Sequence, residues 1–218
     1  MINSNIRKLT LSGWLKKHYR CSFDSSLKLQ KFLLLYESFC KVFNEKYDFN
    51  NLRGWERGPV FSNVWGDYTK EKIEFLMMSK ACYENNFQHI KEDIAQKCGF
   101  IVSSLTEQEL SNITHEMNIW KAQYYRIHNG ERNVTLCELD FNQNDEQIIR
   151  SLDEMYPIEM INNSEIINLK EKYFIISKSN ITKLKSKHFN VLTRLSECEE
   201  LNNPVFVDID EEGRLLID

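Results

Sequence analysis

The chain has 218 residues, which is enough for one large domain or two small ones with a sizeable core. Its 42% hydrophobic and 28% charged residues are ordinary for a globular protein, and a net charge of −4 gives no general attraction to nucleic acid. The first residues lack the apolar segment of a signal peptide, and no apolar run approaches the ~20 residues of a membrane helix, so we expect a cytoplasmic protein without a membrane association.

Two helices are predicted in the first part of the chain. A short helix is expected over residues 5–19, and a long central helix over residues 25–46, capped by Asp24 or Ser25. Apolar side chains recur at three- and four-residue steps along the second helix, which predicts one buried stripe. Its members are Leu29, Phe32, Leu33, Tyr36, Phe39, Cys40 and Phe43.

The middle of the chain is predicted to be helical after an extended or irregular segment at residues 47–57. Pro59 is expected to open a short helix, because its fixed φ suits the first helical turn. Thr69 would cap the next helix, which ends near Cys82. Three further helices are predicted: residues 85–98 with Gly99 as a C-cap, a helix opened by a capping box at Thr106, and residues 116–127.

The character of the sequence changes after residue 131. Alternating and β-branched residues predict strands at 134–141 and 172–177, and a terminal hairpin over 205–217 that turns at Gly213. Helices are expected between these strands, at 144–156 and 181–196. The predicted fold is therefore α+β and mainly α: a helical region over residues 1–130, and an α+β region over residues 131–218 packed on it as one unit.

No catalytic site, metal site or cofactor is expected from the sequence. The six cysteines are scattered without a Cys-x-x-Cys pair, and no glycine-rich phosphate loop or nucleophile motif occurs. His115 beside Glu116 is the most enzyme-like pair, and a hydrolase using both stays an alternative. Adjacent helical residues point about 100° apart, however, so Glu116 is poorly placed to orient its neighbour.

Two groups of residues are candidates for contact with a partner. Lys16 and Lys17 belong to a basic stretch that suits an acidic protein; the acidic residues near the C-terminus argue against a dedicated nucleic-acid binder. Phe61, Trp65 and Tyr68 follow a Gly-Pro turn, where aromatic side chains suit either a binding hot spot or core packing.

Three motifs occur in a fixed order: Leu27–Tyr36, Trp55–Phe61 with its Gly-Pro turn, and Ile113–Trp120. Together they resemble the Panacea domain, which SocA-like bacterial and prophage antitoxins share; the resemblance covers roughly residues 8–130. The sequence departs from the family pattern at Ile119, where proline is frequent, and at Gln123, where arginine is common. The motif residues with an expected structural role are Leu29, Gln30, Lys31, Trp55, Gly58, Pro59, Val60, Thr114, His115 and Trp120.

The resemblance implies an antitoxin that binds and neutralises a protein toxin encoded nearby. One mode described in the family delivers the toxin to a protease, with the antitoxin as the adaptor. A phage or prophage protein that binds a host defence component is the alternative within the same class, and a DNA-binding autorepressor ranks third. We expect His115 to hold the Thr114–Trp120 segment against the Gly58-Pro59 turn. The oligomeric state stays open.

Overall fold

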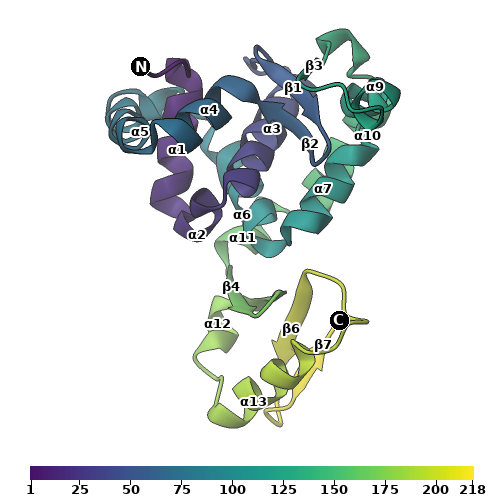
Figure 1. Ribbon diagram of the computed structural model, residues 1–218. Helices are drawn as coiled ribbons and strands as arrows, with labels where there is room; N and C mark the ends of the chain where they lie inside the picture. Colours follow the sequence, from purple (N-terminus) through teal and green to yellow (C-terminus); the bar gives the residue numbers. More distant parts are fainter.

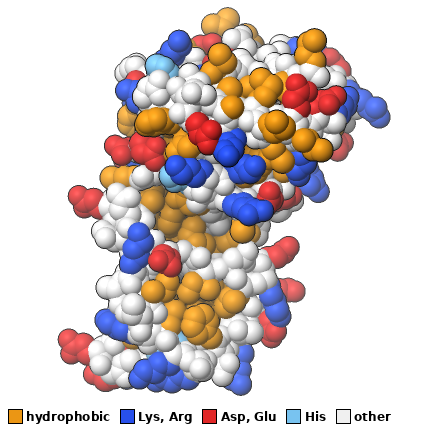
Figure 2. Space-filling view, turned by 90° about the vertical axis from the view of Figure 1, so that its left-hand side faces the viewer, with side chains coloured by type: hydrophobic (Ala, Val, Ile, Leu, Met, Phe, Trp, Pro, Cys, Tyr) orange, Lys and Arg blue, Asp and Glu red, His pale blue; other side chains and the backbone are white.

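A computed structural model describes residues 1–218 and shows two lobes (Figure 1). The larger lobe is helical, and the smaller lobe is built on a four-stranded sheet that begins at residue 164. The fold is therefore α+β and mainly α, as the sequence predicts. Figure 2 shows the same two lobes separated by a narrower waist, with hydrophobic side chains exposed on both.

Helix α3 (Ser26–Val42) is the central element of the larger lobe (Figure 1). It contacts α1 (Ile6–His18), α2 (Arg20–Asp24) and α6 (Glu92–Ser104), as well as strand β2. The predicted stripe is confirmed up to Cys40, whereas its last member, Phe43, follows the end of the helix and is 39% exposed. Burial of this many large side chains makes α3 the main source of hydrophobic stabilisation in the lobe. The buried members are Leu29, Phe32, Leu33, Tyr36, Phe39 and Cys40.

A small sheet lies where the sequence predicts an irregular segment and a helix. Strands β1 (Leu52–Trp55) and β2 (Gly58–Phe61) form a hairpin, and β3 (Val134–Thr135) pairs with β1 from the other side. Pro59 therefore lies in a strand, opposite Gly54. Proline is tolerated there because β2 is an edge strand, where a missing N–H removes no necessary ladder bond.

The other helices of the larger lobe follow the predictions in part. Thr69 lies inside α4 and its hydroxyl bonds back to the Trp65 carbonyl, so it does not cap the next helix. Gly99 lies inside α6, where the ring of Tyr19 covers it, so it is not a C-cap. The capping box at Thr106 is confirmed. The helices are α4 (Ser62–Lys70), α5 (Lys72–Asn86), α7 (Glu107–Glu116), α8 (Asn118–Lys121), α9 (Tyr124–His128), α10 (Gln143–Met155) and α11 (Ile158–Asn162), with 3-10 turns η1 (Phe87–His89) and η2 (Glu138–Asp140).

The smaller lobe contains a sheet with strand order β4-β5-β6-β7. Strands β5 and β6 are parallel, and the connection between them carries two short helices, as a parallel crossover requires. The predicted terminal hairpin is confirmed, with Gly213 at a φ of +74° in its turn. The elements are β4 (Ser164–Leu169), β5 (Lys172–Ser177), α12 (Lys178–Ile181), α13 (Ser186–Leu195), β6 (Val205–Ile209) and β7 (Leu215–Ile217).

The two lobes have separate hydrophobic cores. Helices α10 and α11 bury Ile149, Leu152 and Ile161 in the first core, although the change in sequence character comes earlier, at residue 131. The second core contains five buried residues: Phe174, Ile176, Leu192, Val205 and Val207. Along the chain the boundary between the two cores thus lies near residue 163, with Ile175 of β5 as an exception in the first core, because the segment around β3 belongs to the sheet of the larger lobe.

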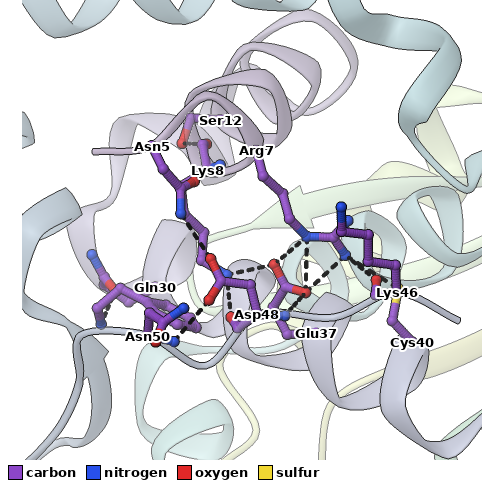
Figure 3. Close-up of polar contacts among 11 residues, drawn as sticks. Asn5, Arg7, Lys8, Ser12, Gln30, Glu37, Cys40, Lys46, Asp48 and Asn50 are labelled. Atoms are coloured by element: carbon purple, nitrogen blue, oxygen red, sulfur yellow. Dashed lines mark hydrogen bonds and ion pairs between the residues drawn. The ribbon is translucent and has the colours of Figure 1, made fainter. Parts of the chain in front are cut away.

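A buried network of charged groups joins α1 to α3 (Figure 3). The carboxylate of Glu37 accepts two hydrogen bonds from Nε of Arg7, at 2.9 and 3.1 Å, and a third from Nη2 at 2.8 Å. It also pairs with the buried ammonium of Lys8 and accepts the backbone N–H of Asp48 at 2.9 Å. Nζ of Lys8 lies 3.9 Å from the ring centroid of Phe61. The carboxylate is therefore fully partnered within the protein.

We predict that Glu37→Gln lowers the free energy of unfolding by roughly 3–5 kcal/mol, because it leaves a buried lysine without its counter-charge. The matched control is Glu146→Gln, which breaks the exposed Arg150–Glu146 pair and should cost less than about 1 kcal/mol. Urea denaturation followed by circular dichroism measures both. Equal costs for the two substitutions would contradict a structural role for the network.

Candidate functional site

Residues of the first two sequence motifs line one surface cleft of about 850 Å³, and Thr114 and Trp120 of the third motif bond to residues that line it. Gln30 and Lys31 of α3 line it from one side, and Pro59 and Val60 of β2 line it from another. A third part of the lining comes from residues 130–133, which precede β3. The remaining lining residues are Ser26, Leu27, Gly54, Trp55, Glu56, Arg57, Trp65, Glu107 and Ile127.

Lys31 connects α3, the β1–β2 turn and α7. Its ammonium donates hydrogen bonds to the carbonyl oxygen of Arg57, at 2.6 Å, and to Oγ1 of Thr114, at 2.7 Å. The side chain is 1% exposed, and burial lowers the pKa of Lys31 to about 7, because the protein interior solvates the charged form poorly. Both acceptors are neutral, and no carboxylate forms an ion pair with this lysine.

Gly58 makes room for the Lys31 ammonium. Its φ of +100° favours glycine, and a Cβ at this position would collide with Nζ of Lys31 and lie 2.8 Å from Oγ1 of Thr114. Gln30, the neighbouring residue on α3, accepts the backbone N–H of Phe61 at 2.8 Å. The hairpin is thus fastened to α3 by side chains from adjacent positions of the first motif.

His115 lies beside the contact between Lys31, Gly58 and Thr114. Its ring stacks on Trp120, with centroids 4.1 Å apart and planes at 19°. Desolvation, and then the nearby charge of Lys31, lower the pKa of His115, whereas a hydrogen bond to the Glu56 backbone raises it. Nε2 is buried and has no hydrogen-bond partner. Nε1 of Trp120 donates to the Trp55 carbonyl at 2.9 Å. The third motif therefore lies against the Gly-Pro turn, as expected from the sequence.

Two tryptophans flank the cleft. The rings of Trp55 and Trp65 meet edge to face, with centroids 5.0 Å apart, and both side chains are half-buried. Nε1 of Trp55 donates to Oδ1 of Asn133 at 2.9 Å, which ties the β1–β2 hairpin to the opposite wall. Asn133 itself has a φ of +56°, a conformation that asparagine adopts more readily than most residues.

The other predicted partner contacts are corrected in part. Phe61 has no exposed surface and Tyr68 is 5% exposed, so neither can be part of a binding surface in this structure. The hydroxyl of Tyr68 donates to the carbonyls of Phe23 and Asp24 instead. Lys17 is exposed and Lys16 partly exposed at the end of α1, but neither lines the cleft. Trp65 is the one predicted aromatic that does.

The enzyme-like pair of the sequence does not form. Glu116 is exposed, and its carboxylate bonds the ammonium of Lys121, so it does not orient the ring of His115. No group of three or more His, Cys, Asp or Glu side chains has an arrangement that could hold a metal ion. Residues 130–133 are the part of the site that the sequence did not indicate. The Asn129-Gly130 turn is the only local signal near them.

We predict that Gly58→Ala costs more than about 2 kcal/mol of unfolding free energy, because the positive φ and the collision with Lys31 add together. Gly130→Ala is the matched control: its φ is +86°, but nothing lies within 4 Å of an added Cβ. It should cost about 1 kcal/mol. Thermal and urea denaturation compare the two, and equal losses would show that the crowding at Gly58 is unimportant.

We also predict a pH dependence from Lys31. With its pKa lowered to about 7, the folded chain binds fewer protons at this site than the unfolded chain does between about pH 7 and the ordinary lysine pKa of 10.5. Its contribution to stability therefore rises with pH across that window. The free energy of unfolding should increase relative to Lys31→Met by on the order of 2 kcal/mol from pH 7 to 9. Because other groups titrate in both proteins, only their difference counts, and a flat difference would contradict the prediction.

Comparison with known proteins adds no family or fold relationship. The sequence matches no protein-family model, and no curated protein or solved structure is significantly similar to it. None of the helices combines the length and apolar character needed to cross a bilayer. The Panacea resemblance therefore stays a prediction from three motifs, and the cleft is the structural feature that bears on function.

Proposed function

We propose that the protein is an antitoxin that binds a toxin encoded nearby, and that the cleft receives a segment of that toxin. The observation that carries the proposal is the convergence of the three motifs: they are far apart in the sequence, yet they line or support a single cleft. Inhibition would follow from direct binding, with or without later delivery to a protease.

The chemistry of the cleft supports a protein ligand. Its volume of about 850 Å³ is within the range of ligand-binding clefts in general. Half-buried tryptophans are frequent anchors of binding energy, because they remove a large apolar area from water at a small entropic cost. Trp55 and Trp65 provide such anchors, and Arg57 and Arg132 add polar contacts around them.

Lys16 and Lys17 have a separate part in the proposal. Their position at the end of α1 suits a role in attracting an acidic partner before the cleft is occupied. Charges at the rim of an interface mainly change the association rate and its salt dependence. Reversing both charges should therefore slow association with little effect on dissociation.

Co-expression with the adjacent reading frame tests the proposal. We expect the neighbour to be toxic alone, to be neutralised by this protein, and to co-purify with it. Trp65→Ala should weaken the complex by about 30-fold, the effect of losing a hot spot of roughly 2 kcal/mol. Phe87→Ala is the matched control, because Phe87 is 58% exposed and does not line the cleft. It should change the affinity less than about twofold.

Two outcomes would contradict the antitoxin proposal. The neighbour could be harmless when expressed alone, or it could be toxic but neither bound nor neutralised. Either result would favour the alternative function, binding of a host defence component by a phage or prophage protein. Unchanged toxin binding in Trp65→Ala would place the interface away from the cleft.

A further inference from the structure

The floor of the cleft contains basic groups without an acidic partner. Lys31 is buried, and both of its hydrogen-bond acceptors are neutral oxygens. His115, whose pKa the charge of Lys31 lowers, is also basic, and its Nε2 has no partner. Buried lysines are normally paired with an acid, because a lone charge is poorly solvated inside a protein. Glu37 on the same helix shows the usual arrangement, with Arg7 and Lys8 around one carboxylate.

One N–H group of the Lys31 ammonium forms no hydrogen bond within the protein. A lysine ammonium has three N–H groups, and Lys31 uses one on the Arg57 carbonyl and one on the Thr114 hydroxyl. The third has no acceptor within the protein. Lys31 is among the residues that line the cleft, but it is only 1% exposed, so a ligand bonds this N–H only by entering the floor of the cleft. The protein thus presents one fixed hydrogen-bond donor with a partial or full positive charge.

We propose that the floor of the cleft is a carboxylate-binding site, in which Lys31 donates its third N–H to a carboxylate of the bound protein segment. The carboxylate is an aspartate or glutamate side chain or the C-terminus of the partner. This inference rests on the proposed function only for the origin of the segment. A carboxylate supplies the missing counter-charge, and binding it draws a proton onto the lysine.

The surroundings favour a carboxylate that belongs to a peptide. A single donor suits a singly charged group, whereas phosphate groups are usually bound by several N–H groups at once. Trp55 and Trp65 beside the floor suit an apolar residue next to the carboxylate. At the rim, Arg132 takes part in no ion pair, whereas Arg57 contacts Glu107 at 3.7 Å, and Glu56 and Glu131 also line the cleft. Arg132 is therefore the rim cation available to a second acidic group.

Three small probes test the site without knowledge of the partner. N-acetyl-leucine carries a terminal carboxylate, N-acetyl-glutamate α-amide carries a side-chain carboxylate, and N-acetyl-glutamine α-amide is the neutral control. Ligands of this size, at about 0.3 kcal/mol for each heavy atom, bind with a Kd of a few millimolar. The readout is the NMR titration of the lysine ¹³Cε signals, with the Lys31 signal assigned from Lys31→Arg.

We expect at least one carboxylate probe to raise the titration midpoint of Lys31 by about one pH unit at saturation, equivalent to tenfold tighter binding to the charged lysine. The neutral amide should leave it unchanged. Lys28 is an internal control in the same spectrum, since it lies on α3 but bonds Tyr173 and does not line the cleft. The responding probe identifies a terminal or a side-chain carboxylate as the preferred group.

Equal binding of the neutral and charged probes would overturn the proposal, and so would a carboxylate response at Lys28 in place of Lys31. Lys31→Met should abolish the preference for carboxylates; if that variant does not fold, the titration of the unmodified protein decides alone. The result is separable from the antitoxin proposal. A toxin that binds while all probes fail removes only the carboxylate site, and probes that bind while no toxin does remove only the antitoxin function.

Discussion

The contacts of the Lys31 ammonium are the constraint on which the site depends. One side chain joins the central helix to the turn of the β1–β2 hairpin and to α7, so the cleft has a floor and a defined wall. The same helix carries a second buried charge, Glu37, with opposite properties. Glu37 is surrounded by cations and hydrogen-bond donors, so all of its partners lie within the protein and its role is structural. Lys31, in contrast, has one N–H group without an acceptor and no counter-charge within the protein. This difference is why we propose that Lys31, and not Glu37, recognises a ligand.

Local sequence patterns predicted the elements whose stability is local. The apolar stripe of α3 and the capping box at Thr106 each occur within a few turns of one helix; the capping box is confirmed, and so is the stripe up to Cys40. Strand β1 lies in a segment predicted as extended or irregular, but its place in a sheet was not predicted, because part of its support is distant. It has four residues, and one of its two neighbours, β3, lies about eighty residues further along the chain. Pro59 was misread for the same reason, since a proline at an edge strand and at a helix start look alike in sequence.

The sequence predicted several residues of the site, but it did not predict the shape of the cleft or all of its lining. The motifs identify Lys31, Gly58 and Thr114, which the structure brings into contact. The wall at residues 130–133 has no comparable signal, because its place depends on the pairing of β3. The aromatic residues after the Gly-Pro turn were ambiguous for a different reason. Phe61 and Trp65 are both large aromatic residues, and only the tertiary packing, which includes Lys8 of α1 against the Phe61 ring, makes the first fully buried and the second half-buried.

The division into two cores has a consequence for synthesis on the ribosome. Apart from Ile175, the residues of the first core are complete by Ile161, whereas the second core needs Val205 and Val207 of β6. Strand β5 must therefore wait for a parallel partner that emerges about thirty residues later. The larger lobe, with its cleft, can acquire its structure while β5 still lacks that partner. A partner protein that is present during translation could therefore bind the folded cleft before synthesis of the chain is complete.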